Sequence, residues 1–122
     1  METNRKHPRG LKHVWHATLT ALAGLHAAWQ HEDAFRQEVL IATLAIPAAL
    51  LLPVSTAGKA LMIASILLVL IVELLNSALE AAVDHTSLER HPLAKRAKDI
   101  ASTAVLLSIV NAAAVWSLIL LF

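Results

Sequence analysis

The chain lacks several features that would place it in a common class of protein. It contains no cysteine, which excludes disulfide bonds. It has only three glycines, and neither G-x-x-x-x-G-K-[ST] nor a glycine-rich kinase loop occurs in it. Any nucleotide site is therefore not one of the common types. Basic residues open the chain, but no compact apolar core with a small-residue cleavage site follows them, so we expect no cleavable signal peptide.

Apolar residues are abundant instead. They make up 57% of the 122 residues, and the mean hydropathy is +0.64. A soluble domain of this length leaves much of its surface in water, so this composition would expose large apolar areas. The net charge of +1 is uninformative, but the distribution of charge is not. The composition predicts a membrane protein.

Three apolar segments approach or exceed the roughly 20 residues that a transmembrane helix needs. They are residues 35–54, 60–83 and 100–122, and the first contains Pro47 and Pro53. Together they predict an all-α integral membrane protein with a single membrane domain, residues 1–122. A charged loop at 84–99 is predicted between the second and third segments.

The amino-terminal region is different in character. Residues 1–10 are predicted to form a basic arm, and residues 11–31 have the pattern of an amphipathic helix. With modest hydrophobicity and basic or neutral polar residues opposite its apolar side, this helix suits the membrane interface. A surface helix packed on protein is the alternative. The apolar side carries Leu11, Val14, Trp15, Thr18, Leu22, Leu25 and Trp29.

Lysine and arginine gather on one side of the predicted membrane domain. The turn at residues 55–59 holds a single lysine, and the carboxyl terminus holds none. By the positive-inside rule, the amino terminus and the 84–99 loop are predicted to be cytoplasmic. The basic residues that decide this are Arg5, Lys6, Arg9 and Lys12, followed by Arg90, Lys95, Arg96 and Lys98.

The most informative motif is Glu73-x-x-Asn76-x-x-x-Glu80-x-x-x-Asp84, at the end of the second apolar segment. On a helix these four residues fall at roughly 0°, 300°, 340° and 20°, which is one narrow face. A charged side chain at the centre of a bilayer costs about 2.5–3.5 kcal/mol on insertion scales. This face is therefore predicted to meet something polar instead of lipid.

The two glutamates of this motif are expected at different depths in the membrane. Glu80 lies near the cytoplasmic headgroup level, and Glu73 lies about 10.5 Å deeper. Such an arrangement suits a site that joins a water-soluble substrate to a lipid. Three acidic residues, Glu32, Asp33 and Glu38, are expected to approach the same interface from the first apolar segment, and Lys98 with Asp99 from the third. Carboxylates with a lysine match the needs of a Mg²⁺-nucleotide site; structural pairing of the carboxylates with Lys and Arg is the alternative.

Three stretches carry a resemblance to a known family. They are WQHEDAFRQE (29–38), VELLNSALEAAVD (72–84) and HPLAKRAKDIASTAVLL (91–107). Their pattern resembles the prokaryotic diacylglycerol kinases, small integral-membrane lipid kinases, and the resemblance covers about residues 11 to 122. It implies an interfacial helix and three transmembrane helices per subunit. It also implies a homotrimer in the bacterial inner membrane, with active sites shared between neighbouring subunits.

The resemblance also implies roles for particular residues. Glu73 would be the general base that takes the proton of the lipid hydroxyl, and Asn76 would orient the site. Glu32 and Glu80 would hold Mg²⁺ together with the phosphates of ATP. Further ATP contacts would come from His13, Glu89, Arg90, His91, Lys98 and Asp99. The lipid cleft would be lined by Trp29, Ala34, Phe35, Arg36, Gln37, Glu38 and Ser102.

The resulting prediction is ATP-dependent phosphorylation of diacylglycerol to phosphatidic acid. The expected partners are ATP, diacylglycerol, the lipid bilayer and further copies of the chain, and no nucleic acid. An undecaprenol kinase of the same family is the nearest alternative. A small proton or ion carrier is an alternative of a different class, since intramembrane carboxylates also mark proton relays; a non-catalytic scaffold would leave Glu73 without a purpose.

Overall fold

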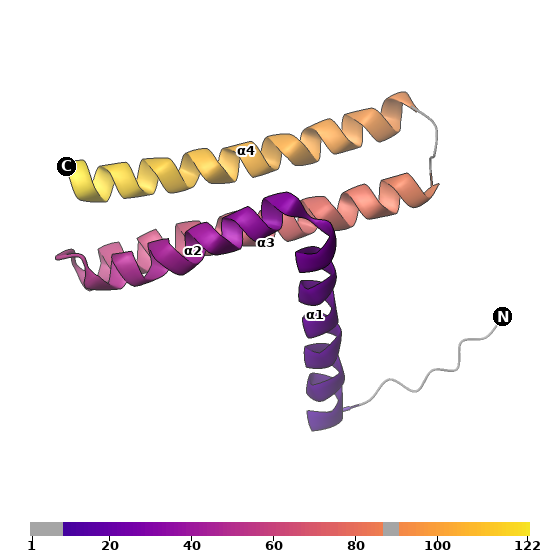
Figure 1. The fold of residues 1–122 in the computed structure, drawn as a ribbon, viewed down its shortest axis with the longest axis horizontal. Helices are drawn as coiled ribbons and strands as arrows, with labels where there is room; N and C mark the ends of the chain where they lie inside the picture. Colours follow the sequence, from indigo (N-terminus) through magenta and orange to yellow (C-terminus); the bar gives the residue numbers. More distant parts are fainter. Residues whose placement is uncertain (1–8, 87–90) are drawn as a thin grey trace. The chain divides into compact units, whose positions relative to one another are not determined.

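The computed structural model describes residues 9–86 and 91–122, and within them every regular element is an α-helix. The helices are α1 (Leu11–His31), α2 (Asp33–Leu51), α3 (Thr56–Thr86) and α4 (Pro92–Leu121), as Figure 1 shows. The chain divides into two compact units, Met1–His31 and Glu32–Phe122.

The first unit contains α1, whose bounds are those predicted from the apolar pattern. Gly10 precedes the helix with a φ of 66°, a backbone conformation that glycine adopts without steric cost, and its carbonyl accepts the first helical hydrogen bond from Val14. Large apolar side chains of α1 are exposed, among them Trp15 at 63% and Leu22 at 56%. The placement of α1 in the membrane interface stays a prediction.

The second unit begins with α2, which is shorter than the predicted segment 35–54 at its carboxyl end. Pro47 lies inside the helix, whereas the helix ends at Leu51, two residues before Pro53. The Leu52 amide still donates to the carbonyl of Ala48, at 3.0 Å. A proline lacks an amide hydrogen and restricts the residue before it, which explains why the helix stops here.

A short turn connects α2 to α3. The Ser55 hydroxyl accepts a hydrogen bond from the Gly58 amide at 3.0 Å, which caps the start of α3. The Lys59 ammonium group donates to the Leu50 carbonyl near the end of α2. Gly58 is buried, and a Cβ there would lie 3.3 Å from the capping Ser55 hydroxyl and at an ordinary contact distance of 3.5 Å from Ile119 of α4.

Helices α3 and α4 are longer than the predicted segments 60–83 and 100–122, and much of the predicted loop 84–99 is helical. Helix α3 continues to Thr86, and α4 starts at Pro92. At 1.5 Å per residue each helix is about 45 Å long, which exceeds a hydrocarbon core of roughly 30 Å. The charged residues continue the helices beyond the apolar part. This is possible because a helix makes its backbone hydrogen bonds internally, both in lipid and in water.

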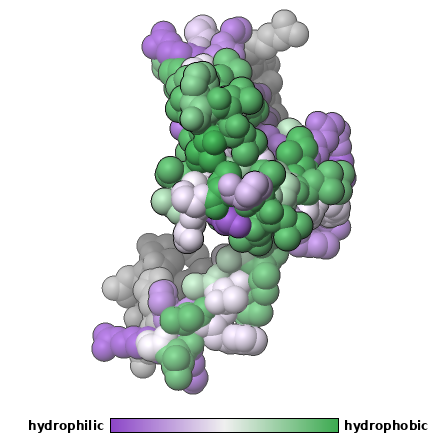
Figure 2. Space-filling model, turned by 90° about the vertical axis from the view of Figure 1, so that its left-hand side faces the viewer, coloured by the Kyte–Doolittle hydropathy of each residue, from purple (hydrophilic) through white to green (hydrophobic). Residues whose placement is uncertain are grey.

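Helix α3 packs against both α2 and α4 in the second unit. Its buried positions form one stripe along the helix, namely Gly58, Met62, Ser65, Val69 and Glu73. The outer sides of the bundle are apolar and exposed, for example Leu44 at 76% and Leu107 at 62%. Figure 2, which views the bundle from the end that carries the α2–α3 turn, shows hydrophobic residues over much of the visible bundle surface. Helices α2, α3 and α4 are each long and apolar enough to cross a membrane.

Candidate functional site

The buried stripe of α3 ends at a carboxylate, that of Glu73. The side chains of Met62 and Val69 are buried, and Glu73, one turn further along, is only 4% exposed. No ion pair among residues 9–86 and 91–122 involves this carboxylate. A buried carboxylate without a cationic partner is costly in a structural role and is typical of a functional one.

Three further glutamates lie near Glu73. Glu32 and Glu80 are close enough to interact with it by direct charge–charge forces, and so is Glu38. Two of the four carboxylates come from the start of α2 and two from α3. The structure therefore brings together the acidic residues that the sequence placed in separate segments, as we expected for Glu32 and Glu38. We call Glu32, Glu38, Glu73 and Glu80 the acidic cluster.

Polar atoms beside the acidic cluster are incompletely bonded. The Asn76 amide nitrogen donates to the Glu80 carboxylate at 3.3 Å. Among the residues that the structure describes, the Asn76 amide oxygen, the Ser77 hydroxyl and one carboxylate oxygen of Glu38 are buried without a hydrogen-bond partner. Glu32 stands at the N-cap position of α2, yet its side chain makes no capping bond. The three buried atoms thus lack the hydrogen bonds that buried polar groups normally make.

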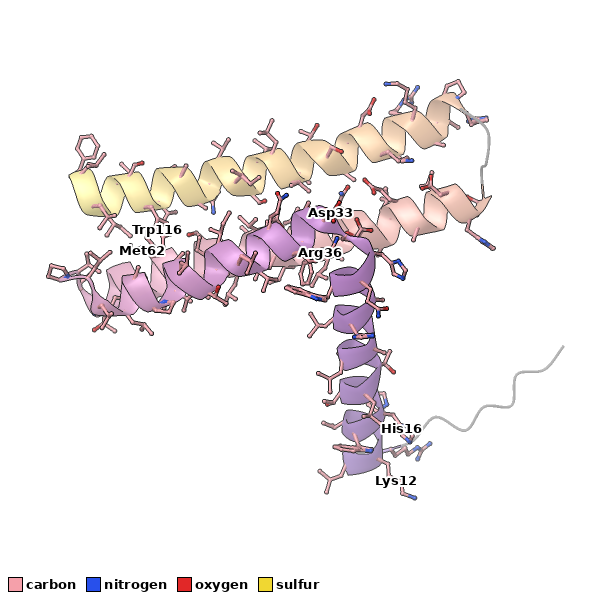
Figure 3. The ribbon with its side chains drawn as sticks, viewed as in Figure 1. Lys12, His16, Asp33, Arg36, Met62 and Trp116 are labelled. Carbon is pink, nitrogen blue, oxygen red and sulfur yellow. The ribbon has the colours of Figure 1, made fainter. Side chains whose placement is uncertain are left out.

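Ion pairs surround the end of the bundle where α3 leads into α4. Lys98 of α4 donates to Asp84 of α3 at 2.8 Å, which ties the two helices together. Lys95 donates to Asp99 at 2.6 Å within α4. Arg36 pairs with Asp33 on the first turns of α2, as Figure 3 shows. The pairing of some acidic groups with Lys and Arg, which we held as an alternative, thus applies to Asp33, Asp84 and Asp99 in this chain.

Other predicted site residues are less informative. The His91 ring accepts a hydrogen bond from the Leu93 amide at 3.1 Å and caps α4, a role that the sequence did not indicate. Phe35 is buried, whereas Ala34, Gln37 and Ser102 are exposed. His13 and Trp29 belong to the first unit. Glu89 and Arg90 lie outside the described residues. The assigned roles of all these residues stay predictions.

An apolar groove adjoins the acidic cluster. Its volume is about 410 Å³, and it runs between the three helices of the second unit. Trp116 lines it and donates from its ring nitrogen to the backbone carbonyl of Met62 at 3.1 Å, and Figure 3 shows the two residues side by side. Sequence reasoning did not find this groove. It is lined by Glu38 and Ile41 of α2, Ile66 and Leu70 of α3, and Ala112 and Trp116 of α4.

The donor set of the acidic cluster suits a hard cation. Mg²⁺ prefers oxygen ligands and is usually bound by one or two carboxylates together with substrate phosphates. Among the described residues, no three His, Asp or Glu side chains are placed to hold one ion by themselves. Glu32 and Glu80, both near Glu73, offer two carboxylates, a number that fits a metal completed by phosphate oxygens.

The fold and these side chains define a class: a helical membrane protein whose bundle encloses carboxylates next to an apolar groove. Comparison with known proteins identifies the family. The sequence profile of the prokaryotic diacylglycerol kinases matches residues 19–120, and the chain belongs to this family. The resemblance stated from the sequence is thereby confirmed.

Curated relatives agree with this assignment. The chain is 54% identical to the diacylglycerol kinase of Pseudomonas aeruginosa over 112 residues, which cover 92% of this chain and 91% of the relative. It is 48% identical to the diacylglycerol kinase of Escherichia coli K12 over 97 residues, covering 80% of each chain. The Haemophilus influenzae diacylglycerol kinase is 42% identical over 113 residues, with 93% and 96% covered.

Proposed function

We propose that this protein transfers the γ-phosphoryl group of ATP to the free hydroxyl of diacylglycerol, giving phosphatidic acid and ADP. One observation carries the proposal: Glu38 both lines the apolar groove and interacts with Glu73 of the acidic cluster. A single side chain thus joins a surface suited to acyl chains with the carboxylates suited to phosphoryl transfer. The names of the relatives support the same substrate.

Glu73 acts as the general base in this proposal. Glu73 is buried one turn beyond Val69, which lines the groove, and this supports a role for its carboxylate where a lipid hydroxyl would arrive from the bilayer. The carboxylate accepts the hydroxyl proton while the lipid oxygen forms a bond to the γ-phosphorus. The bond from that phosphorus to the bridging oxygen of ADP breaks in the same transfer. Positioning and charge stabilisation supply most of the rate in such reactions.

Glu32 and Glu80 would hold Mg²⁺ with the phosphates of the nucleotide. When bound there, the metal neutralises charge that develops on the phosphoryl oxygens. Asn76 keeps the Glu80 carboxylate oriented through its amide hydrogen bond. Lys98 and Asp99 lie at the start of α4, where they would contact ATP. Lys98 is held by Asp84, which presents it at the water-accessible end of the bundle.

The protein would act as a homotrimer in the bacterial inner membrane. The three helices leave large apolar faces uncovered, and a single chain encloses neither a nucleotide nor a lipid headgroup completely. Neighbouring copies would cover part of these faces and complete each site. The amino terminus and the connection between α3 and α4 would face the cytoplasm, where ATP is available.

Substrate choice is tested with purified protein in mixed micelles that contain Mg²⁺ and labelled ATP. Diacylglycerol and undecaprenol are offered separately, and label in the lipid phase is measured. We expect label in phosphatidic acid and little in undecaprenyl phosphate. Preferential labelling of undecaprenol would favour the other kinase, and no labelled lipid in either sample would contradict a lipid kinase.

The orientation of the chain in the membrane needs its own test. Because the chain has no cysteine, a single thiol can be introduced at a chosen position. Single variants Ser55→Cys and Arg96→Cys place thiols at opposite ends of the bundle. In intact cells, a membrane-impermeant thiol reagent should label the Ser55→Cys variant and spare Arg96→Cys until the membrane is opened. The reverse pattern would invert the proposed topology.

A further inference from the structure

The Ser77 hydroxyl is the one polar group near the acidic cluster to which no role has been given. Its oxygen is buried and has no hydrogen-bond partner within residues 9–86 and 91–122. An unmade hydrogen bond on a buried group costs more than a made bond contributes. In a helix, serine commonly avoids this cost by donating to a carbonyl of the preceding turn.

Two other buried serines of the bundle do so. Ser65 of α3 donates to the Met62 carbonyl at 2.7 Å, and Ser108 of α4 donates to the Val105 carbonyl at 2.7 Å. Ser77 also lies within a regular helix, which offers carbonyls in the preceding turn. Its hydroxyl nevertheless makes no such bond within the described residues, so a ligand or another chain would have to supply one.

The location of Ser77 favours a ligand. It lies four residues after Glu73 and three before Glu80, which is about 6 Å and about 4.5 Å along the helix axis. On the helix it falls roughly 40° from Glu73 and 60° from Glu80, so it shares their face. In the proposed function, the lipid hydroxyl that accepts the phosphoryl group lies at Glu73, and the metal-bound nucleotide lies at Glu80. Ser77 lies at the level between them, where the phosphoryl group would pass.

We propose that Ser77 is a further catalytic residue whose hydroxyl donates a hydrogen bond to a non-bridging oxygen of the transferring phosphoryl group. The proposal rests on the proposed function, because it uses the assigned positions of base and metal. A donor aimed at developing charge in a site shielded from water stabilises the transition state more than the ground state. The hydroxyl makes no hydrogen bond within the described residues, so a small shift that opens the buried oxygen to the phosphoryl group breaks no existing bond of its own.

The test compares Ser77→Ala with wild type in the micelle assay, with Ser65→Ala as the matched control from the same helix. Loss of one such donor lowers kcat by about 10²-fold in well-studied enzymes. We expect a fall of at least about tenfold for Ser77→Ala, with KM for both substrates within about twofold. Ser77→Thr, which keeps the hydroxyl, should recover most of kcat, and Ser65→Ala should keep it.

Thermal stability separates this role from a structural one. Alanine is a better helix former than serine, and its introduction removes a buried unbonded group. Ser77→Ala should therefore melt at the wild-type temperature or above it while it loses activity. A lower melting temperature or a dissociated oligomer, with kcat retained, would show that Ser77 bonds a neighbouring chain and would overturn the proposal.

A sulfur substitution provides a second readout. In ATPγS, one non-bridging oxygen of the γ-phosphate is replaced by sulfur, a weak hydrogen-bond acceptor. The ratio of kcat with ATP to kcat with ATPγS should be smaller in Ser77→Ala than in wild type, by about threefold or more. An unchanged ratio would contradict the contact.

Glu73→Gln, measured in parallel, distinguishes failure of the Ser77 contact from failure of the proposed function. If Glu73→Gln is inactive and Ser77→Ala is fully active, the Ser77 proposal fails and the proposed function stands. If Glu73→Gln turns over normally, the site of transfer has been misplaced and both proposals fall.

Discussion

The two halves of α3 differ in whether their buried polar groups are hydrogen-bonded. In the half from Thr56 to Val72, every buried side-chain polar atom in the described structure is bonded within the chain. Ser65 bonds its own helix, and Met62 offers its carbonyl to both Ser65 and Trp116. In the half from Glu73 to Thr86, a carboxylate is buried without a cation, and two neighbouring side chains keep unbonded oxygen or hydroxyl groups.

This difference indicates a structural role for the first half of α3 and a functional role for the second. Inside hydrocarbon or a protein bundle no water is available, so unsatisfied groups carry a large cost. The first half avoids that cost because its buried polar groups are hydrogen-bonded. In the second half, Glu73, Asn76 and Ser77 carry the cost of burial without full bonding. We expect such groups only where substrate, metal or another subunit supplies the missing hydrogen bonds.

The largest expected effect comes from Glu73→Gln in the second half. Glutamine is nearly isosteric and cheaper to bury than a carboxylate, so the oligomer should be at least as stable as wild type. It cannot accept the hydroxyl proton, and phosphoryl transfer should fall to background. The measurement is labelled phosphatidic acid in micelles, together with a melting curve. Near-normal turnover would remove Glu73 as the base.

Substitution of the metal-binding pair should have the next largest effect. Glu32→Ala and Glu80→Ala each remove one oxygen ligand and should raise the Mg²⁺ concentration for half-maximal activity. Loss of groups that only support metal ligands costs about 10–100-fold, so we expect at least tenfold here. Asp33→Ala is the control, because Asp33 pairs with Arg36. A variant with unchanged Mg²⁺ dependence would exclude that residue from the metal site.

Mixed oligomers test whether one site draws on two chains. Glu32→Ala subunits and Glu73→Gln subunits, each inactive, are combined in equal amounts and reassembled. If each site takes Glu32 from one subunit and Glu73 from its neighbour, random assembly leaves about a quarter of the sites intact. Recovery of activity near that level is expected. Verified mixed oligomers without activity would mean that each site is built within one chain, as the proximity of Glu32 and Glu73 in this structure also permits.

The smallest effect is expected in the first half of α3. Trp116→Phe removes the hydrogen bond to the Met62 carbonyl, which still accepts from Ser65. The loss should destabilise the bundle by about 0.5–1.5 kcal/mol and lower the melting temperature by a few degrees. Trp15→Phe, on α1, is the control. A Trp116→Phe variant that melts at the wild-type temperature would show that this contact contributes nothing measurable.

The sequence by itself determined the helical class, the three apolar segments and the narrow polar face of Glu73, Asn76 and Glu80. Hydrophobic length and a 3.6-residue period are local properties, so they can be read without knowledge of tertiary contacts. Motifs such as E-x-x-N-x-x-x-E also indicated the family, because residue types at fixed spacing along one helix are local information too. Helix ends were less predictable, because charged residues at 84–86 and 92–99 continue helices that composition alone assigned to a loop.

Only the tertiary structure decided which polar groups meet and which stay unbonded. Glu32 and Glu38 come close to Glu73 because α2 packs on α3, a contact between segments more than 30 residues apart. The same packing leaves the Ser77 hydroxyl buried and unpartnered, although Ser65 on the same helix has an identical side chain. Hydrogen-bond satisfaction depends on the atoms that surround a group in three dimensions, and the linear pattern of residues does not contain that information.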